Sequence, residues 1–194
     1  MNLGGVAVLL AELHESLSAP EFSHSLITGV CAENEIDILG EFFFLISKFR
    51  LSSFKRYNCL SAASFCNSNF SFCLRKDILK ISQSGPATPD HVIRTKRLPM
   101  VGRDLDLYSK KYQEYFNRNS KRYKKDLSIL DTVPRVILDK EFGLCTIGRN
   151  IKEATIVNEI YSHTIKIISQ SCALSGYKAL PEEDIFDVEY WELE

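Results

Sequence analysis

The stretch Gly85-Pro86-Ala87-Thr88-Pro89-Asp90-His91-Val92-Ile93-Arg94-Thr95-Lys96 brings two closely spaced prolines together with a dense group of polar side chains. Each proline fixes its own φ angle, biases the preceding residue toward extended geometry and removes a backbone N–H donor. An acid, an imidazole, a guanidinium, a hydroxyl and an ammonium follow the second proline. The stretch therefore predicts an extended turn that delivers chemically active side chains to the start of the next element.

If Val92–Thr95 forms a short strand, alternate side chains point to opposite faces. Arg94 and Lys96 would then share a face and suit a phosphate or a carboxylate, while Asp90 could orient the imidazole of His91. An ordinary turn whose charges make local hydrogen bonds explains the same string. As candidate site residues we take His91 and Asp90 for catalysis and Arg94, Thr95 and Lys96 for substrate binding.

Downstream of this stretch, the spacing predicts a helix over residues 105–124. Its apolar stripe is aromatic, which fits either core packing or, less often, a stacking platform for a sugar or nucleobase. The stripe consists of Leu105, Tyr108, Tyr112, Tyr115 and Phe116.

Two β-branched runs, 135–138 and 144–147, flank a turn that contains Gly143 and predict a hairpin. A long apolar stripe then predicts a helix over 150–175, and residues 180–194 predict a short acidic helix or turn. Residues 80–194 thus predict an α/β sandwich, with a mixed or antiparallel sheet covered by the two long helices.

The first 80 residues give weaker signals. Helical spacing predicts a helix over 3–19, and residues 36–50 fit an apolar helix or a strand pair. Residues 51–74 show no clean period, which indicates either irregular structure or, as we favour, sequence under weak constraint. Residues 75–81 predict a short helix. We therefore divide the chain into a variable, partly helical N-terminal segment, 1–80, and a domain, 81–194.

Composition places the chain among soluble globular proteins. It is 45% hydrophobic and 25% charged, with a formal net charge of −1, which gives no reason to expect nucleic acid or an anionic membrane as partner. No stretch is long enough to span a bilayer. The basic run 94–125 and the acidic run 182–194 are interpreted as solvated faces. Six cysteines without a secretory signal or a zinc spacing predict reduced thiols and a cytoplasmic protein.

Several segments, taken in order, are similar to one family. They are residues 85–96, Pro134-Arg135-Val136-Ile137-Leu138, Gly143-Leu144-Cys145-Thr146-Ile147-Gly148-Arg149 and Asp184-Ile185-Phe186-Asp187-Val188-Glu189-Tyr190-Trp191-Glu192-Leu193-Glu194. Together they resemble, over about residues 80–194, the portion between the catalytic parts of bifunctional class II aldolase/short-chain dehydrogenase proteins of the rhamnulose-1-phosphate aldolase/alcohol dehydrogenase type.

The resemblance implies a class II aldolase/adducin-like α/β/α sandwich, here partial. In that fold the strand equivalent to 141–144 carries a zinc-binding histidine, but this chain has Glu141-Phe142-Gly143-Leu144 there, and the upstream His-x-His pair is missing too. No glycine-rich dinucleotide loop occurs either. A zinc ion is therefore expected only because of the resemblance, and the sequence does not identify the residues that would bind it.

Three functional hypotheses follow. The first is a class II aldolase-like domain of carbohydrate (sugar phosphate) metabolism, a truncated or split member that lacks the zinc histidines and the dehydrogenase domain; any activity would be that of an aldehyde-lyase. The second is a non-catalytic assembly domain, whose hairpin edge and aromatic helix pack on a second copy or on a separate aldolase or dehydrogenase chain. The third is a module that binds a sugar phosphate through Arg94 and Lys96.

Overall fold

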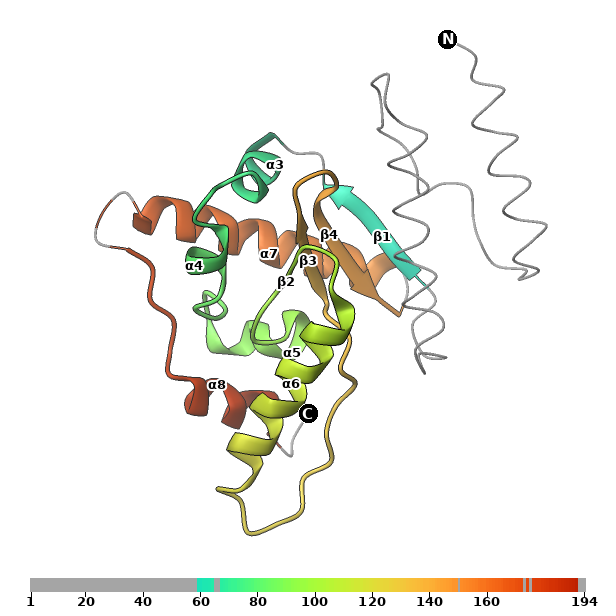
Figure 1. Cartoon of the computed structure of the whole chain (residues 1–194), viewed down its shortest axis with the longest axis vertical. Helices are drawn as coiled ribbons and strands as arrows, with labels where there is room; N and C mark the ends of the chain where they lie inside the picture. Colours follow the sequence, from blue (N-terminus) through green and yellow to red (C-terminus); the bar gives the residue numbers. More distant parts are fainter. Residues whose placement is uncertain (1–58, 65–66, 150, 173, 175, 192–194) are drawn as a thin grey trace, which may run out of the picture.

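The computed structural model describes residues 59–64, 67–149, 151–172, 174 and 176–191, shown in colour in Figure 1. The helices predicted over 3–19 and 36–50 lie outside these residues. The elements, in chain order, are β1 (Cys59–Ser64), α3 (Asn67–Cys73), α4 (Ile78–Ser82), the 3-10 helix η2 (Pro89–His91), α5 (Val92–Thr95), β2 (Met100–Val101), α6 (Leu105–Ser120), β3 (Val136–Asp139), β4 (Gly143–Gly148), α7 (Ile151–Cys172) and α8 (Glu182–Glu189).

The four strands form one mixed sheet in the order β1-β4-β3-β2. The strands β1, β4 and β3 are antiparallel to their neighbours, whereas β2 runs parallel to β3. The predicted hairpin is confirmed as β3 and β4, but it lies in the centre of the sheet rather than at an edge. The prediction that its edge is open to a partner is therefore wrong, because β1 and β2 cover it on both sides.

Side chains alternate across this hairpin, so that each face has its own core. Val136, Leu138 and Leu144 pack with the apolar stripe of α7, while Ile137 and Cys145 pack with the start of α6. This alternation is what a strand with both faces covered requires. The strand β3 is accordingly buried at all four positions.

Helix α6 begins and ends close to the predicted bounds, and all five residues of its aromatic stripe are buried. The Asp104 carboxylate caps the helix by accepting a hydrogen bond from the backbone N–H of Leu107 at 2.9 Å. The second half of the stripe packs on α8 in a separate aromatic cluster. Core packing is therefore the observed use of these rings, and they hold α8 against α6. Figure 1 shows these two helices next to each other.

Two local predictions are wrong. Residues Val92–Thr95 form the helix α5, not a strand, because four residues, even with three β-branched side chains, carry too little pattern to separate the two states. Residues 51–74 contain β1 and α3, although we interpreted them as sequence under weak constraint. The strand β1 pairs with β4, a partner that is distant in sequence and that local periodicity does not reveal.

The turn between β3 and β4 is held by the Asp139 side chain. Its carboxylate accepts hydrogen bonds from the backbone N–H groups of Glu141 and Phe142, at 2.8 and 3.1 Å, and from Arg103 Nε at 2.8 Å. Burial alone would raise the pKa of Asp139, but these donors outweigh it and lower the pKa below the ordinary value of 3.8.

Replacing Asp139 by asparagine is expected to lower the free energy of unfolding at pH 7 by about 2–3 kcal/mol, because the Arg103 guanidinium loses a charged partner. Because the pKa of Asp139 is lower in the folded than in the unfolded protein, its ionised carboxylate stabilises the fold at pH values above the unfolded-state pKa. This stabilisation is lost as the pH falls through the folded-state pKa. Urea unfolding of both proteins should therefore show the difference narrowing below about pH 4. A difference that stays constant down to pH 2 would contradict the assignment.

Candidate functional site

The predicted site residues lie on η2, on α5 and just after it, so they do not alternate as on a strand. Asp90 is exposed, and a hydrogen bond with the Thr88 side chain lowers the pKa of its carboxyl. His91 is half-buried, and its Nδ1 atom is buried without a hydrogen-bond partner among the described residues. The pair therefore remains adjacent, with Asp90 turned to solvent.

The three predicted substrate-binding residues do not converge on one ligand. The Arg94 side chain is exposed. The Thr95 hydroxyl is buried and donates to the backbone carbonyl of His91 at 2.9 Å, as hydroxyls on helices commonly do. Lys96 is only 5% exposed and extends into the protein. The structure thus separates Arg94 from Lys96, which a strand would have placed side by side.

Lys96 is the most unusual of these residues. It ends α5 with a φ of +59°, which residues other than glycine seldom adopt. Its ammonium donates to the backbone carbonyl of Asp131, lies 3.7 Å from an Asp131 carboxylate oxygen and sits 3.7 Å from the centre of the Tyr112 ring. Burial lowers the pKa of Lys96 to about 8, against the attraction of Asp131. A strained backbone and a buried cation at one residue are typical of a functional position.

Glu189 of α8 lies beside this cation, and the sequence analysis missed it. Its carboxylate accepts hydrogen bonds from the hydroxyls of Tyr112 and Tyr115, at 2.8 and 3.0 Å. Burial raises the pKa of Glu189, although Lys96 and the two hydroxyls act in the opposite direction. Its position in the helix could have revealed it. Glu189 follows Ile185 by four residues and Phe186 by three, so it lies on the same buried face of α8 as these two side chains.

The basic and acidic runs of the sequence face each other across α6 and α8. Arg97 and Arg118 both pair with Glu182, at 3.2 and 3.0 Å, and Arg122 pairs with Asp187. The interpretation of these runs as solvated faces holds for most of their charged side chains, which are exposed, but it did not foresee the ion pairs that join the two runs. Because the Arg118 and Arg122 pairs are partly exposed, each adds little stability, and their main effect is to fix the position of α8.

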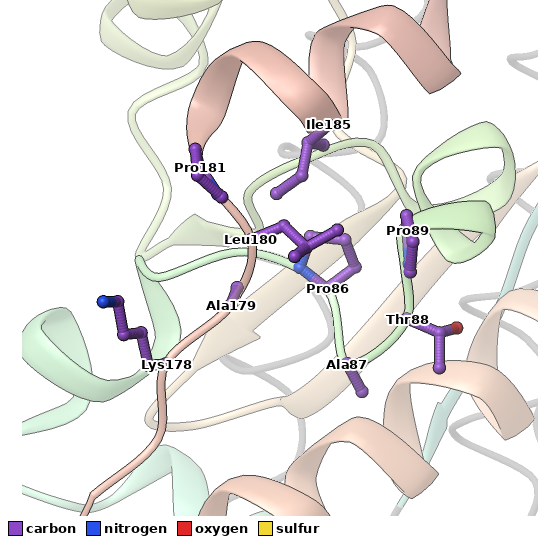
Figure 2. A pocket seen from close by; sticks show the side chains of 9 residues that line it. All are labelled: Pro86, Ala87, Thr88, Pro89, Lys178, Ala179, Leu180, Pro181 and Ile185. Carbon is purple, nitrogen blue, oxygen red and sulfur yellow. The ribbon is translucent and has the colours of Figure 1, made fainter.

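A groove of about 540 Å³ runs between residues 86–89 and the segment that leads into α8. Figure 2 shows Pro86, Leu180 and Ile185 meeting in its centre, while the Lys178 ammonium points outward. Immediately before the two lining segments, the Tyr177 hydroxyl donates a hydrogen bond to the carbonyl of Gly85 at 3.1 Å. The groove is therefore mainly apolar, and it lies where residues 86–89 pack against residues 178–181 and Ile185.

Comparison with known proteins adds a family. A family model described as "Aldolase class II, second domain" matches residues 52–194, which include every element of the sheet and its helices. The chain belongs to this family. The match begins well before residue 80, so the family similarity extends through β1 and α3, which the sequence analysis excluded from it.

One curated relative of this second-domain chain is the "Uncharacterized oxidoreductase YuxG" of Bacillus subtilis (strain 168). The two are 28% identical over 131 residues, which are 59% of this chain and 19% of the relative. The chain thus spans about a fifth of that protein's length. No solved structure matches. None of the helices in the described part of the chain is long and apolar enough to cross a membrane.

The zinc implied by the class II aldolase resemblance finds no matching ligand set here. Among residues whose positions the structure describes, no three His, Cys, Asp or Glu side chains lie together as a metal site would need. His91 is half-buried, and His163 is exposed on α7. The described part of this second domain therefore does not supply a zinc centre of its own.

Cys73 and Cys145 are buried thiols, whereas Cys172 is half-buried, and none of the three is in a disulfide. Burial raises the pKa of Cys73 to about 12 and raises that of Cys145 further. Because the thiolate is the reactive form, iodoacetamide at pH 7.5 is expected to label Cys172 in the native protein and to spare the other two. Peptide mass spectrometry checks this, with urea-unfolded protein as the fully labelled control; equal labelling in the native state would contradict the burial.

Proposed function

We propose that this chain serves as the non-catalytic second domain of a class II aldolase-type enzyme of carbohydrate (sugar phosphate) metabolism. Its role would be to hold or complete an assembly whose chemistry is carried by another domain or another chain. The observation that supports this most directly is the internal use of its charged side chains. Lys96, Glu189 and the arginines that contact α8 are engaged by other side chains of the domain, so these charged groups hold the domain itself together.

The family match supports the same role, since its description is that of a second domain. The relative's name gives it as an oxidoreductase and the match covers a fifth of its length, which leaves most of that protein for other domains. We infer that the partner of this chain is a class II aldolase or dehydrogenase domain, or a second copy. A role in sugar-phosphate chemistry follows from the class II aldolase resemblance.

The first experiment assays the purified chain for cleavage of rhamnulose 1-phosphate, with and without added Zn²⁺. We expect no turnover above that of buffer, because the candidate residues Asp90 and Arg94 are exposed and do not converge with Lys96. Zinc-dependent cleavage that is lost in His91→Ala would overturn the non-catalytic role and restore the aldehyde-lyase hypothesis.

The second experiment tests assembly directly. The segment of the Bacillus relative that matches this chain, 131 residues long, is deleted in one variant and replaced by the present chain in another. We expect the replacement to recover the solubility and the molar mass of the intact relative in light scattering, and the deletion to lose them. A deletion variant that assembles as well as the intact protein would count against a structural second domain.

A further inference from the structure

The apolar groove described above has walls of extended chain. Thr88, with φ −132° and ψ 147°, and Pro181, with φ −52° and ψ 150°, both have extended backbone angles. No main-chain hydrogen bond joins residues 86–89 to residues 178–181, and the structure describes both segments in full. The two walls therefore stand apart, so that a third extended segment can lie between them.

The side chains of the groove suit an apolar anchor with a carboxylate beside it. Pro86, Leu180 and Ile185 meet in its centre (Figure 2), and 47% of the Leu180 surface remains exposed. Among the described residues that line the groove, only Lys178 carries a charge, and its ammonium points outward. The volume of about 540 Å³ lies in the range of pockets that bind ligands.

The chain itself carries a segment of matching chemistry, Trp191-Glu192-Leu193-Glu194. Trp191 is 59% exposed, although tryptophan is among the residues most enriched at the energetic centres of protein interfaces. In an extended chain alternate side chains point to opposite sides, so Trp191 and Leu193 would share one side and the two glutamates the other. The apolar side complements the floor of the groove, and the acidic side complements the Lys178 ammonium.

A second copy can supply this segment, whereas the same chain would have to fold it back along α8. The groove extends from Pro181, just before α8, to Ile185 within it, and Trp191 lies beyond the other end of the helix and does not line the groove of its own chain. Residues 192–194 span at most about 10 Å, which is less than the length of α8, about 12 Å. Two copies related by a two-fold axis can exchange these segments reciprocally, which closes the assembly at a dimer.

We propose that the groove centred on Pro86, Leu180 and Ile185 binds the segment 191–194 of a second copy of this chain, with Lys178 facing its carboxylates, and that two copies exchange these segments in a dimer. This inference rests on the proposed function, because it names the partner and the surface of the assembly. The two fail differently. A monomeric chain that still restores the Bacillus relative keeps the second-domain role, whereas cleavage of rhamnulose 1-phosphate removes that role and leaves a dimer without it.

The single tryptophan of the chain makes the test direct, because all tryptophan emission comes from Trp191. Light scattering and emission spectra of the full chain are recorded from about 1 μM to about 1 mM, a range that brackets the weak dimer expected of so small an interface. We expect the molar mass to rise toward that of the dimer. The emission should shift to shorter wavelength over the same concentrations, as the indole leaves water.

Two lysine substitutions separate the groove from the rest of the surface. Leu180→Lys places an ammonium in the apolar centre and is expected to weaken the association at least about tenfold. Leu107→Lys is the matched control, because Leu107 is also 47% exposed but lies on α6, outside the groove. It should associate as wild type does.

Three results would overturn the proposal. One is equal weakening by the two substitutions, and another is a dimer that persists unchanged in Leu180→Lys. The third is a wild-type chain that stays monomeric at every concentration. If the emission of such a monomer is that of a buried indole, the segment occupies the groove of its own chain; if it is that of an exposed indole, the groove does not bind the segment.

A second measurement tests whether the segment binds in the groove. A synthetic peptide of residues 187–194 is titrated into the full-length variant Trp191→Ala, so that all tryptophan emission comes from the peptide. We expect a saturable shift to shorter wavelength, and binding at least about tenfold weaker to the double variant Leu180→Lys/Trp191→Ala. Emission that does not change, or equal binding by the two proteins, would contradict the proposal.

Discussion

Replacing Phe186 by alanine is expected to lower the free energy of unfolding by about 3–5 kcal/mol, enough to unfold a large fraction of molecules at 37 °C. Phe186 is 0% exposed and stands at the centre of the aromatic cluster between α6 and α8. Its ring stacks on Tyr190 at 4.4 Å and meets Tyr115 edge-on at 5.4 Å. The variant therefore loses both the buried area of the ring and these oriented contacts.

Urea unfolding followed by far-UV circular dichroism measures this loss. Trp191→Ala is the matched control, because it also removes an aromatic ring near the end of α8 but from a side chain that is 59% exposed. We expect this control to stay within about 0.5 kcal/mol of wild type. Comparable losses in the two variants would mean that α8 is not anchored through Phe186.

Replacing Gly148 by alanine is expected to cost at least about 3 kcal/mol, because the added methyl group has no space. Gly148 is the last residue of β4, just before α7. A Cβ atom there would lie 2.5 Å from the main-chain nitrogen of Ala154 and 2.9 Å from the Cβ of Glu153. A backbone atom cannot move aside as a flexible side chain can, so the strand and the helix would have to separate.

Gly102→Ala separates this steric effect from backbone strain. Gly102 has a φ of +79°, but a Cβ atom there would meet nothing within 4 Å. We expect it to cost about 1 kcal/mol, the usual penalty for a left-handed alanine. Thermal melts of both variants give the comparison. If Gly102→Ala proves the more damaging of the two, the close approach of α7 to β4 is not what Gly148 provides.

Elements with a repeated local pattern were predictable from the sequence. Helix α6 spans four turns, so its apolar stripe recurs often enough to fix both the state and the buried face. The hairpin of β3 and β4 was equally readable, since its strands and its glycine turn are contiguous in sequence. Neither α5 nor β1 offered this, because one is four residues long and the other depends on a distant partner.

The candidate site was predicted only in part. Lys96 was chosen for its charge, but its burial follows from α5 and from the left-handed residue that ends it, which the sequence pattern does not show. Glu189 was not chosen as a candidate, because nothing in the sequence distinguishes it from the other acidic residues of 182–194. Its role depends on the packing of α8 against α6, and the tyrosines that hold it are distant in sequence. The site could not be predicted in full because its residues are brought together by contacts between distant segments, and the residue types alone do not show these contacts.

The strand order has a consequence for the time course of folding. The central strands β3 and β4 are joined by a short turn and need little loop closure, so they are the natural nucleus of the sheet. Ser64 of β1 pairs with Leu144 of β4, and this contact must wait until the whole intervening chain is present. On the ribosome, β1 would therefore emerge first and pair last, and its exposed edge during that interval is where a nascent chain of this protein would be most open to misassembly.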